Sequence, residues 1–173
     1  MEGKKEKVSR DEIGDFDILV LTYVNDIRKL IYSYVKHGET VEDLAQEVFL
    51  SAYQGYHNFR GDSSAKTWLF KIAINKCKDH LKSWHHRHLV LTEFFQEKSS
   101  RSTAETEAIA GLEKQELAKA IMALPLKYRE IIILYYYHDL SLPEISGLLN
   151  MNSNTVKTRL ARGRDLIKRR YGS

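Results

Sequence analysis

Cysteine, proline and long apolar runs are all scarce in this sequence: its 173 residues include one cysteine and two prolines. A single cysteine, Cys77, excludes an internal disulfide and a zinc site built on several cysteines, and it suits a reducing compartment. No apolar run approaches the roughly 18 residues that a membrane-spanning helix needs. The charged start, MEGKKEKVSRDE, is not followed by the apolar core of a secretion signal. We therefore expect a cytoplasmic, mostly helical protein without membrane insertion.

Motifs that carry enzymatic chemistry are also missing. The chain has no phosphate-binding glycine loop, no nucleophile elbow and no His-x-x-x-His pair. His85, His86 and His88 are close together, but adjacent histidines point to different faces of a helix, and no carboxylate or cysteine completes a metal set. Asp43 and Glu47 share a helix surface without the Glu-x-x-His partner of a di-iron site. We expect no enzyme activity, metal, cofactor or small-molecule substrate, and interpret the histidines as a polar helix end.

Positive charge is concentrated near the end of the chain. Residues 153–170 hold seven basic side chains and one acid, a formal charge of +6, whereas the whole chain carries +4. The rest of the chain is therefore close to neutral or slightly acidic. Such an uneven distribution indicates an anionic partner for the last segment.

The segment from Leu140 to Tyr171 has the spacing of two short helices with a polar break at 150–152. Pro143 falls in the first turn of the first helix, where its missing N–H costs nothing, and Ser153 or Asn154 is expected to cap the second. The residues expected to be buried are Leu142, Ile145, Leu148 and Leu149 before the break and Val156, Leu160, Gly163 and Ile167 after it. This pattern is typical of a helix-turn-helix, whose second helix enters the DNA major groove.

An ordinary helical hairpin with a solvated basic face is the alternative. The local charge of +6 and the small Gly163 on the inner face, which permits close helix approach, favour DNA binding. The outward face also begins with short hydrogen-bonding side chains, Asn154 and Thr158, rather than glutamates. Near Ala161 and Arg162 it continues as a basic surface.

The first half of the chain predicts three helices after an arm at 1–15. The first helix begins at Phe16 and ends at His37-Gly38; the second is capped by Thr40 and runs to Tyr53. Its buried face holds Val41, Leu44, Ala45 and Val48, with Tyr53 as a further candidate, while Asp43, Gln46, Glu47 and Phe49 lie on other faces.

The third helix begins near Lys66, with Trp68, Leu69 and Ile72 expected on its inner face. On the other side, Lys71, Asn75, Lys78 and Lys82 form a stripe at helical spacing. A basic stripe with an amide donor suits the tracking of a phosphate backbone, although a solvated lysine face gives the same pattern. Residues 89–108 are rich in Ser, Thr and Glu and predict a flexible acidic linker before a second helical domain at 109–171.

Three segments in this order resemble the extracytoplasmic-function (ECF) sigma factors, the two-domain members of the sigma-70 family of bacterial RNA polymerase. They are DLAQEVFLSAY at 43–53, FRGDSSAKTWLFKIAINKCKDHL at 59–81, and the segment from LPLKYRE at 124 to DLIK at 168. The resemblance implies an all-α chain of two small helical domains: a region 2-like domain at 16–88 and a helix-turn-helix, region 4-like domain at 109–171.

The resemblance also implies partners and site residues. In the first domain, the polymerase's largest-subunit coiled coil would meet Asp43, Gln46, Glu47 and Phe49. The promoter −10 element would meet Arg60, Asp62, Ser63, Ser64, Lys71, Asn75, Lys78 and Lys82. In the second domain, the −35 element would meet Asn154, Lys157, Thr158, Arg159 and Arg162, with Arg164 and Lys168 neutralising phosphate. Further implied partners are the polymerase flap region and an anti-sigma factor, often membrane-anchored.

Several alternatives stay open at this point. A stand-alone transcriptional regulator, or an inhibitor that mimics a sigma factor, would share much of the pattern. Trp68 lies beside the predicted melting site, where an aromatic ring can stack on a base, but its spacing favours the core. Cys77 lies beside lysines that would lower its pKa, but a small core residue is the commoner role.

Overall fold

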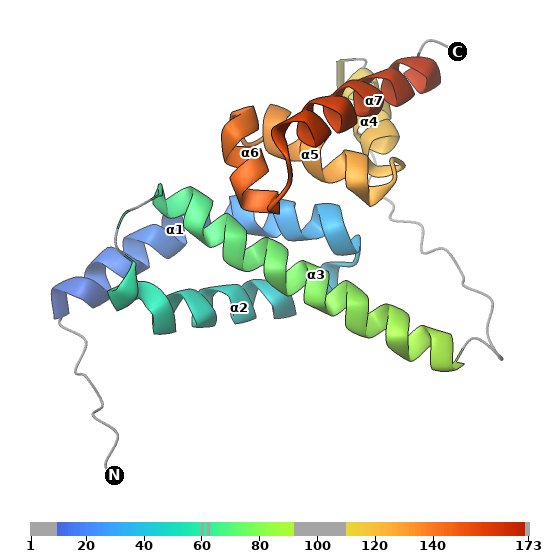
Figure 1. Cartoon of the computed structure of the whole chain (residues 1–173). Coiled ribbons are helices and arrows are strands. Elements are labelled where there is room, and N and C mark those ends of the chain that lie inside the picture. The colour runs from blue at the N-terminus through green and yellow to red at the C-terminus, as the bar shows by residue number, and fades with distance from the viewer. Residues whose placement is uncertain (1–9, 60, 62, 92–109, 172–173) are drawn as a thin grey trace. The chain divides into compact units, whose positions relative to one another are not determined.

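The computed structural model describes the backbone of residues 10–59, 61, 63–91 and 110–171, and the side chains of 15–59, 61, 63–85 and 115–170. All regular structure in these ranges is helical (Figure 1), which confirms the predicted all-α class. The elements are α1 (Arg10–Val35), α2 (Gly38–Gly55), the 3-10 turn η1 (Tyr56–Asn58), α3 (Ala65–Leu91), α4 (Ala110–Met122), α5 (Leu126–Tyr136), α6 (Leu142–Leu149) and α7 (Ser153–Tyr171).

These helices group into two compact units that divide within α3, between Cys77 and Lys78. Helix α1 begins at Arg10, so residues 10–15 of the predicted arm are helical. Helix α3 continues to Leu91, into the predicted linker. Residues 1–9 and 92–109, which hold the rest of the arm and linker, lie outside the described residues.

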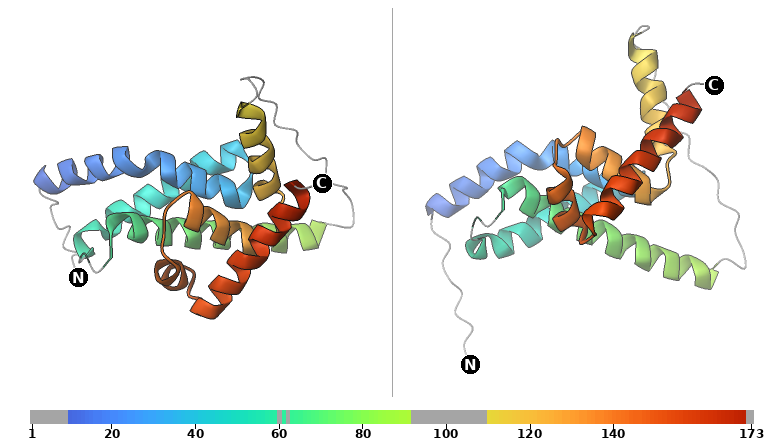
Figure 2. Two further views of the ribbon diagram at one scale, coloured as in Figure 1. Left: turned by 90° about the horizontal axis from the view of Figure 1, so that it is seen from above. Right: turned by 45° about the horizontal axis from the view of Figure 1, so that its top comes forward.

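The core of the first unit lies between α1, α2 and the first half of α3. Helices α1 and α2 pack along each other, and α3 lies beside them in both views of Figure 2. Buried apolar residues include Ile27, Leu30 and Ile31 of α1, Leu44 and Val48 of α2, and Leu69, Phe70, Ala73, Ile74 and Cys77 of α3. The predicted inner face of α3 was wrong by part of a turn, since Trp68 and Ile72 are only half-buried. The run from Trp68 to Ile74 is apolar on most sides, so periodicity could not orient it.

The connection between α1 and α2 differs from the sequence prediction at both helix ends. Lys36, not Gly38, adopts the left-handed conformation, with φ of 57°. His37 precedes α2 without a side-chain cap, and Thr40 lies inside the helix. The Thr40 hydroxyl instead lies 3.3 Å from His37 Nδ1.

In the second unit, α7 packs against α4, α5 and α6. Arg129 of α5 is buried, and its Nη1 donates hydrogen bonds to the carbonyls of Met122 at 3.0 Å and Leu124 at 2.8 Å. These carbonyls belong to the end of α4 and its following turn, where backbone acceptors lack helical partners. A buried arginine therefore closes the connection from α4 to α5.

Gly163 brings α7 close to α5, as predicted. A Cβ at this position would lie 3.0 Å from Cγ1 and 3.2 Å from Cδ1 of Ile132. That spacing is tighter than an ordinary van der Waals contact, so the two helices approach as closely as a glycine allows.

We expect Gly163→Val to destabilise the second unit by about 1–3 kcal/mol, because added methyl groups would overpack the α5–α7 contact. Gly147→Ala is the matched control: nothing lies within 4 Å of a Cβ there, so alanine should stabilise α6 by about 0.5–1 kcal/mol. Thermal unfolding followed by circular dichroism measures both. Equal stability of Gly163→Val and the wild-type chain would show that α5 and α7 leave room for a side chain at this position.

Cys77 is a core residue rather than a reactive thiol. It is fully buried, and this burial raises the pKa of its thiol from 9.0 to about 12. Proximity to lysines in the sequence therefore does not activate it, which agrees with the commoner interpretation.

The raised pKa of Cys77 predicts a loss of stability in alkali. Above pH 9.0 the unfolded chain releases the thiol proton, whereas the folded chain keeps it until about pH 12. The free energy of unfolding therefore falls as the pH rises through this range. Between pH 8 and pH 10 the free energy of unfolding of the wild-type chain should fall by about 1 kcal/mol more than that of Cys77→Ala, which has no thiol. Urea unfolding at the two pH values measures this; parallel behaviour of the two chains would contradict it.

Candidate nucleic-acid interface

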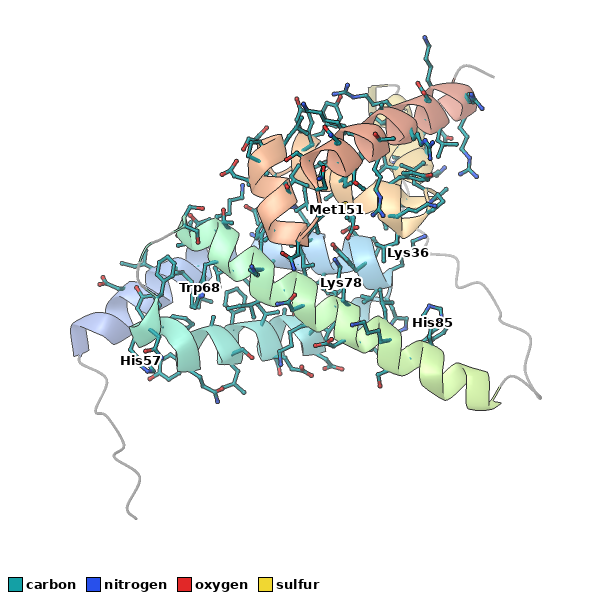
Figure 3. All side chains as sticks on the ribbon, in the orientation of Figure 1. Lys36, His57, Trp68, Lys78, His85 and Met151 are labelled. Atoms are coloured by element: carbon teal, nitrogen blue, oxygen red, sulfur yellow. The ribbon has the colours of Figure 1, made fainter. Side chains whose placement is uncertain are left out.

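The first helix of the helix-turn-helix, α6, is capped at both of its ends. Ser141 and Glu144 form reciprocal hydrogen bonds at the start of α6, with Pro143 in the first turn as predicted. Asn150 ends α6 in the left-handed conformation, φ 54°, and the N–H of Met151 bonds to the carbonyl of Ser146 at 2.9 Å. Met151 marks this turn in Figure 3.

The cap of α7 is Asn152, and the predictions of Ser153 or Asn154 were wrong. Asn152 Oδ1 accepts a hydrogen bond from the Asn154 N–H at 2.8 Å. Three consecutive residues here have side chains able to cap a helix, so composition could not select among them. The Asn154 side chain is exposed and remains on the outward face.

Helix α7 separates an apolar face from a polar, basic one. Val156, Leu160 and Gly163 are buried and Ile167 is half-buried. The exposed residues of the first three turns include Asn154, Lys157, Thr158, Ala161 and Arg162, whereas Arg159 is half-buried. The structure thus brings the predicted −35 residues together on one helix.

Two of these side chains have partners within the second unit. The Thr158 hydroxyl donates to the Asn154 carbonyl at 2.8 Å, which leaves its oxygen free to accept. Arg159 Nη1 lies 4.0 Å from Glu130 Oε1. The acid offsets part of the charge of Arg159, so its attraction for phosphate is reduced.

Arg164, predicted to neutralise phosphate, contacts two tyrosines of α5. Its Nε donates to the Tyr136 hydroxyl at 2.7 Å, and its guanidinium lies 5.7 Å and 5.4 Å from the ring centres of Tyr135 and Tyr136. The side chain therefore packs on α5. Together with Lys168 it borders an apolar groove between α4, α5 and α7, whose other lining residues are Leu117, Ile121, Ile132, Tyr136, Tyr137 and Ile167.

The loop before α3 is shaped by local contacts. Gly61 has φ of +73°, a conformation that suits glycine. Ser64 Oγ accepts a hydrogen bond from the Thr67 N–H at 3.1 Å and so caps α3, while Ser63 is exposed. Arg60 and Asp62, also predicted to contact the −10 element, lie outside the described residues.

Trp68 is neither fully buried nor free. Its ring stacks on Phe59, with centres 4.8 Å apart and planes at 29°, and the Tyr56 ring lies 6.4 Å away. Figure 3 shows Trp68 near the start of α3. One face of the ring therefore packs on the loop. A core role is compatible with this position, and stacking of Trp68 on a base stays a prediction.

The predicted stripe on α3 is present at the surface. Lys71, Asn75 and Lys82 are exposed and Lys78 is partly exposed. A further lysine of α3, Lys76, has its Nζ 3.4 Å from Glu47 Oε2, an ion pair that joins α2 to α3.

The outward face of α2 includes residues that the sequence alone did not single out. Asp43, Gln46 and Glu47 are exposed as expected, but Phe49 is half-buried. Leu50 lies on the same face and is 59% exposed, and Tyr53, a candidate for the buried face, lies there too and is 40% exposed. Their helical spacing from Asp43 and Gln46 was the available signal, since apolar residues exposed on a polar face indicate an interaction surface.

Three further observations concern metals, histidines and membranes. Among the side chains described, no three His, Cys, Asp or Glu residues gather as metal ligands would. His85 packs edge-on against Trp84, with ring centres 5.4 Å apart, whereas the side chains of His86 and His88 lie outside the described residues. Within the described ranges, every helix is too short or too polar to cross a lipid bilayer.

Comparisons with known proteins agree with this architecture. The sigma-70 region 2 family model matches residues 19–87, and the sigma-70 region 4 model matches 114–167. The RNA polymerase sigma-H factor of Pseudomonas aeruginosa is 34% identical over 94% of this chain and 89% of its own length. The ECF RNA polymerase sigma factor SigW of Bacillus subtilis is 30% identical over 95% of both chains.

Solved structures share the fold. The sigma factor RpoE of Bartonella quintana, in complex with the anti-sigma factor NepR, superposes with a TM-score of 0.77 at 23% identity, covering 91% of this chain and 97% of that one. CnrH, in complex with the cytosolic domain of CnrY, gives 0.61 at 24% identity over 88% and 84%.

The two matched regions and the full-length relatives define a DNA-recognising transcription factor rather than a known enzyme. The chain belongs to the extracytoplasmic-function group of the sigma-70 family. It accordingly directs promoter-specific initiation of transcription, and its partners are RNA polymerase and promoter DNA.

The different surroundings of Lys157 and Arg164 predict different salt dependence. With core polymerase and a promoter duplex, Lys157→Ala should lower the slope of log K against log salt by about 1, as expected for one lost phosphate contact. Arg164→Ala removes the same charge from the same helix but should leave the slope unchanged, because its guanidinium is bound to α5. Filter binding from low to moderate salt measures both. An equal decrease in the two variants would place Arg164 on DNA.

Proposed function

We propose that the two units divide promoter recognition between them: the first binds core polymerase and opens the −10 element, and the second holds the −35 element. The observation that carries this proposal is the exposed polar and basic face at the start of α7, the second helix of a helix-turn-helix whose first helix is capped at both ends. Such a helix presents its first turns to base edges in the major groove.

In the second unit, Asn154, Lys157, Thr158 and Arg162 contact bases or adjacent phosphates of the −35 element. All four are exposed, and their amide, hydroxyl and cationic groups suit base edges. Arg159, at the side of this face, adds positive charge, part of which is offset by Glu130.

In the first unit, the loop between η1 and α3 receives a base extruded from the −10 element. Extrusion costs a few kcal/mol and is offset by polar contacts in the receiving site. The groups assigned here are Arg60, Asp62, Ser63 and Ser64. Along the whole of α3, on both sides of the division between the units, the separated strand and duplex edge follow Lys71, Asn75, Lys78 and Lys82. Of the two serines, Ser63 is the more available, because Ser64 caps α3.

The docking face for the coiled coil of the polymerase's largest subunit is on α2. Asp43, Gln46, Glu47 and Phe49 form it, and the exposed Leu50 and Tyr53 extend it with apolar area. A surface that mixes apolar and charged side chains in this way suits a protein interface. The apolar groove between α4, α5 and α7 is the corresponding candidate for the flap region.

An anti-sigma factor is the proposed regulator of this chain. Two proteins of the same fold were solved in complex with partners, RpoE with NepR and CnrH with the cytosolic domain of CnrY. The exposed apolar residues Ile18, Leu21 and Leu50 give such a partner surface to cover. We further propose that the chain acts in the cytoplasm, where a membrane-anchored anti-sigma factor holds it inactive.

Reconstituted transcription tests the proposal. Purified chain plus core polymerase, with no other sigma factor, should start RNA at defined sites on a genomic template library, and the mapped starts should share −10 and −35 elements. Core polymerase alone is the control. Absence of specific starts would overturn the proposed function in favour of a regulator or a sigma-mimicking inhibitor.

A binding assay with core polymerase tests the docking face. Asp43→Asn combined with Glu47→Gln should weaken binding of core polymerase at least tenfold, the loss expected when charges central to an interface are removed. Glu116→Gln with Asp139→Asn removes the same charge from exposed sites in the second unit and should bind as the wild-type chain does. Affinity capture of core polymerase by each chain gives the comparison; full retention by the α2 variant would exclude that face.

A further inference from the structure

Ser146, in α6, belongs to none of the sets assigned above, yet it makes two hydrogen bonds to Met151 in the turn that follows (Figure 3). Its carbonyl accepts from the Met151 N–H at 2.9 Å, and its hydroxyl donates to the Met151 carbonyl. Within α7 the carbonyl of Asn152 is the one that accepts from the Val156 N–H, at 3.1 Å. The Met151 carbonyl precedes this first helical bond, so Ser146 supplies a partner that the helix does not.

The Ser146 hydroxyl also reaches the start of α7. Ser153 Oγ donates to Ser146 Oγ at 3.3 Å, which connects α6 to the first residue of the recognition helix. Packing begins later along α7, because Val156 is its first fully buried residue, whereas Ser153 and Asn154 are exposed. The first turn of α7 is therefore held by polar contacts, and the bonds of Ser146 tie it to α6.

This first turn carries Asn154, one of the side chains proposed to contact the −35 element. Asn154 has a short side chain, so its amide moves with the backbone, whereas the longer side chain of Arg162 can adjust. A binding site has to hold its contacting groups within about 0.5 Å of the required geometry. An asparagine that reads a base does so with both atoms of its amide, as in the pairing with adenine. The position of the first turn therefore limits how well Asn154 discriminates between bases.

We propose that Ser146 is a positioning residue: its hydroxyl holds Met151 and the first turn of α7 in the place where Asn154 reads its base pair. This inference rests on the proposed role of Asn154 as a base contact. A purely structural role would lower the thermal stability of the second unit and leave base preference unchanged while the chain is folded. Positioning instead acts on preference at one base pair.

Selection from a duplex library randomised across the −35 element tests the proposal. Holoenzymes are assembled from core polymerase with the wild-type chain, Ser146→Ala, Asn154→Ala or the double variant, well below the unfolding temperature of each chain. Ser146→Ala removes the hydroxyl and keeps the backbone bond to Met151. Gly147→Ala is the matched control: it changes one carbon in the same helix, where nothing lies within 4 Å of the added Cβ, and should leave every position unchanged.

Asn154→Ala should abolish base preference at one position. Ser146→Ala should reduce preference at that same position by about 2–10-fold, the range of one net hydrogen bond, and should add nothing in the Asn154→Ala background. Ser153→Ala removes only the 3.3 Å bond from an exposed residue. It should act at the same position with a smaller effect, and it provides the test if Ser146→Ala does not fold.

A second base pair provides a control within the same selection. Arg162→Ala identifies the position that Arg162 reads. Preference there should survive in Ser146→Ala, because Arg162 follows the buried Val156 and Leu160, which hold that part of α7 against the rest of the unit.

Three results would overturn the inference. Full preference in Ser146→Ala, with preference lost in Asn154→Ala, would exclude positioning and leave the proposed −35 contact intact. An equal loss at the positions of Asn154 and Arg162, or a further loss in the Asn154→Ala background, would assign Ser146 to stability alone. No change at any position in Asn154→Ala would remove the proposed base contact itself, and the inference with it.

Discussion

The close approach of α5 and α7 at Gly163 determines what the second unit can present to DNA. Ile132 fills the space beside this glycine, and the buried Val156 and Leu160 hold the same side of α7 inward. The opposite side must then face outward, with its amide, hydroxyl and basic groups. The orientation of the recognition helix is thus set by apolar packing, while the polar residues are free to vary with the sequence they contact.

Each binding surface is small, and this limits what either can do alone. A short helix face or a four-residue stripe neutralises few phosphates, so affinity in isolation is weak and falls as salt rises. Two such surfaces on one polymerase gain affinity through effective concentration, provided that the spacing of the DNA elements matches their separation. Weak parts also suit regulation, because a partner that covers one surface removes the cooperation between both.

Helical periodicity predicted the all-α class and most buried residues of α2, α6 and α7, because those helices alternate clearly between apolar and polar faces. It failed where that contrast was missing: α3 is apolar on most sides near Phe70, so its inner face was placed wrongly. Capping failed at Asn152 for a related reason, since three capable residues stand in a row.

Charge alone predicted the basic face but not the use of each cation. Arg164 and Lys157 look equivalent in the sequence, yet only the structure shows that Arg164 is bound to Tyr136. The buried Arg129, bonded to the end of α4, gave no sequence signal because its carbonyl partners are backbone atoms. The exposure of Leu50 and Tyr53 likewise depends on whether another helix packs on that face of α2, and the local sequence does not specify this.

The chain has two tryptophans, Trp68 and Trp84, and both lie on α3. Indole fluorescence consequently reports on a single helix. A change in the intensity or wavelength of Trp68 emission would indicate a change in its stacking on Phe59. The helix-turn-helix contains tyrosine but no tryptophan, so it can melt without any change in that emission. A fluorescence melting curve of this protein therefore describes α3 and its neighbours, and the melting of α6 and α7 has to be followed by another signal.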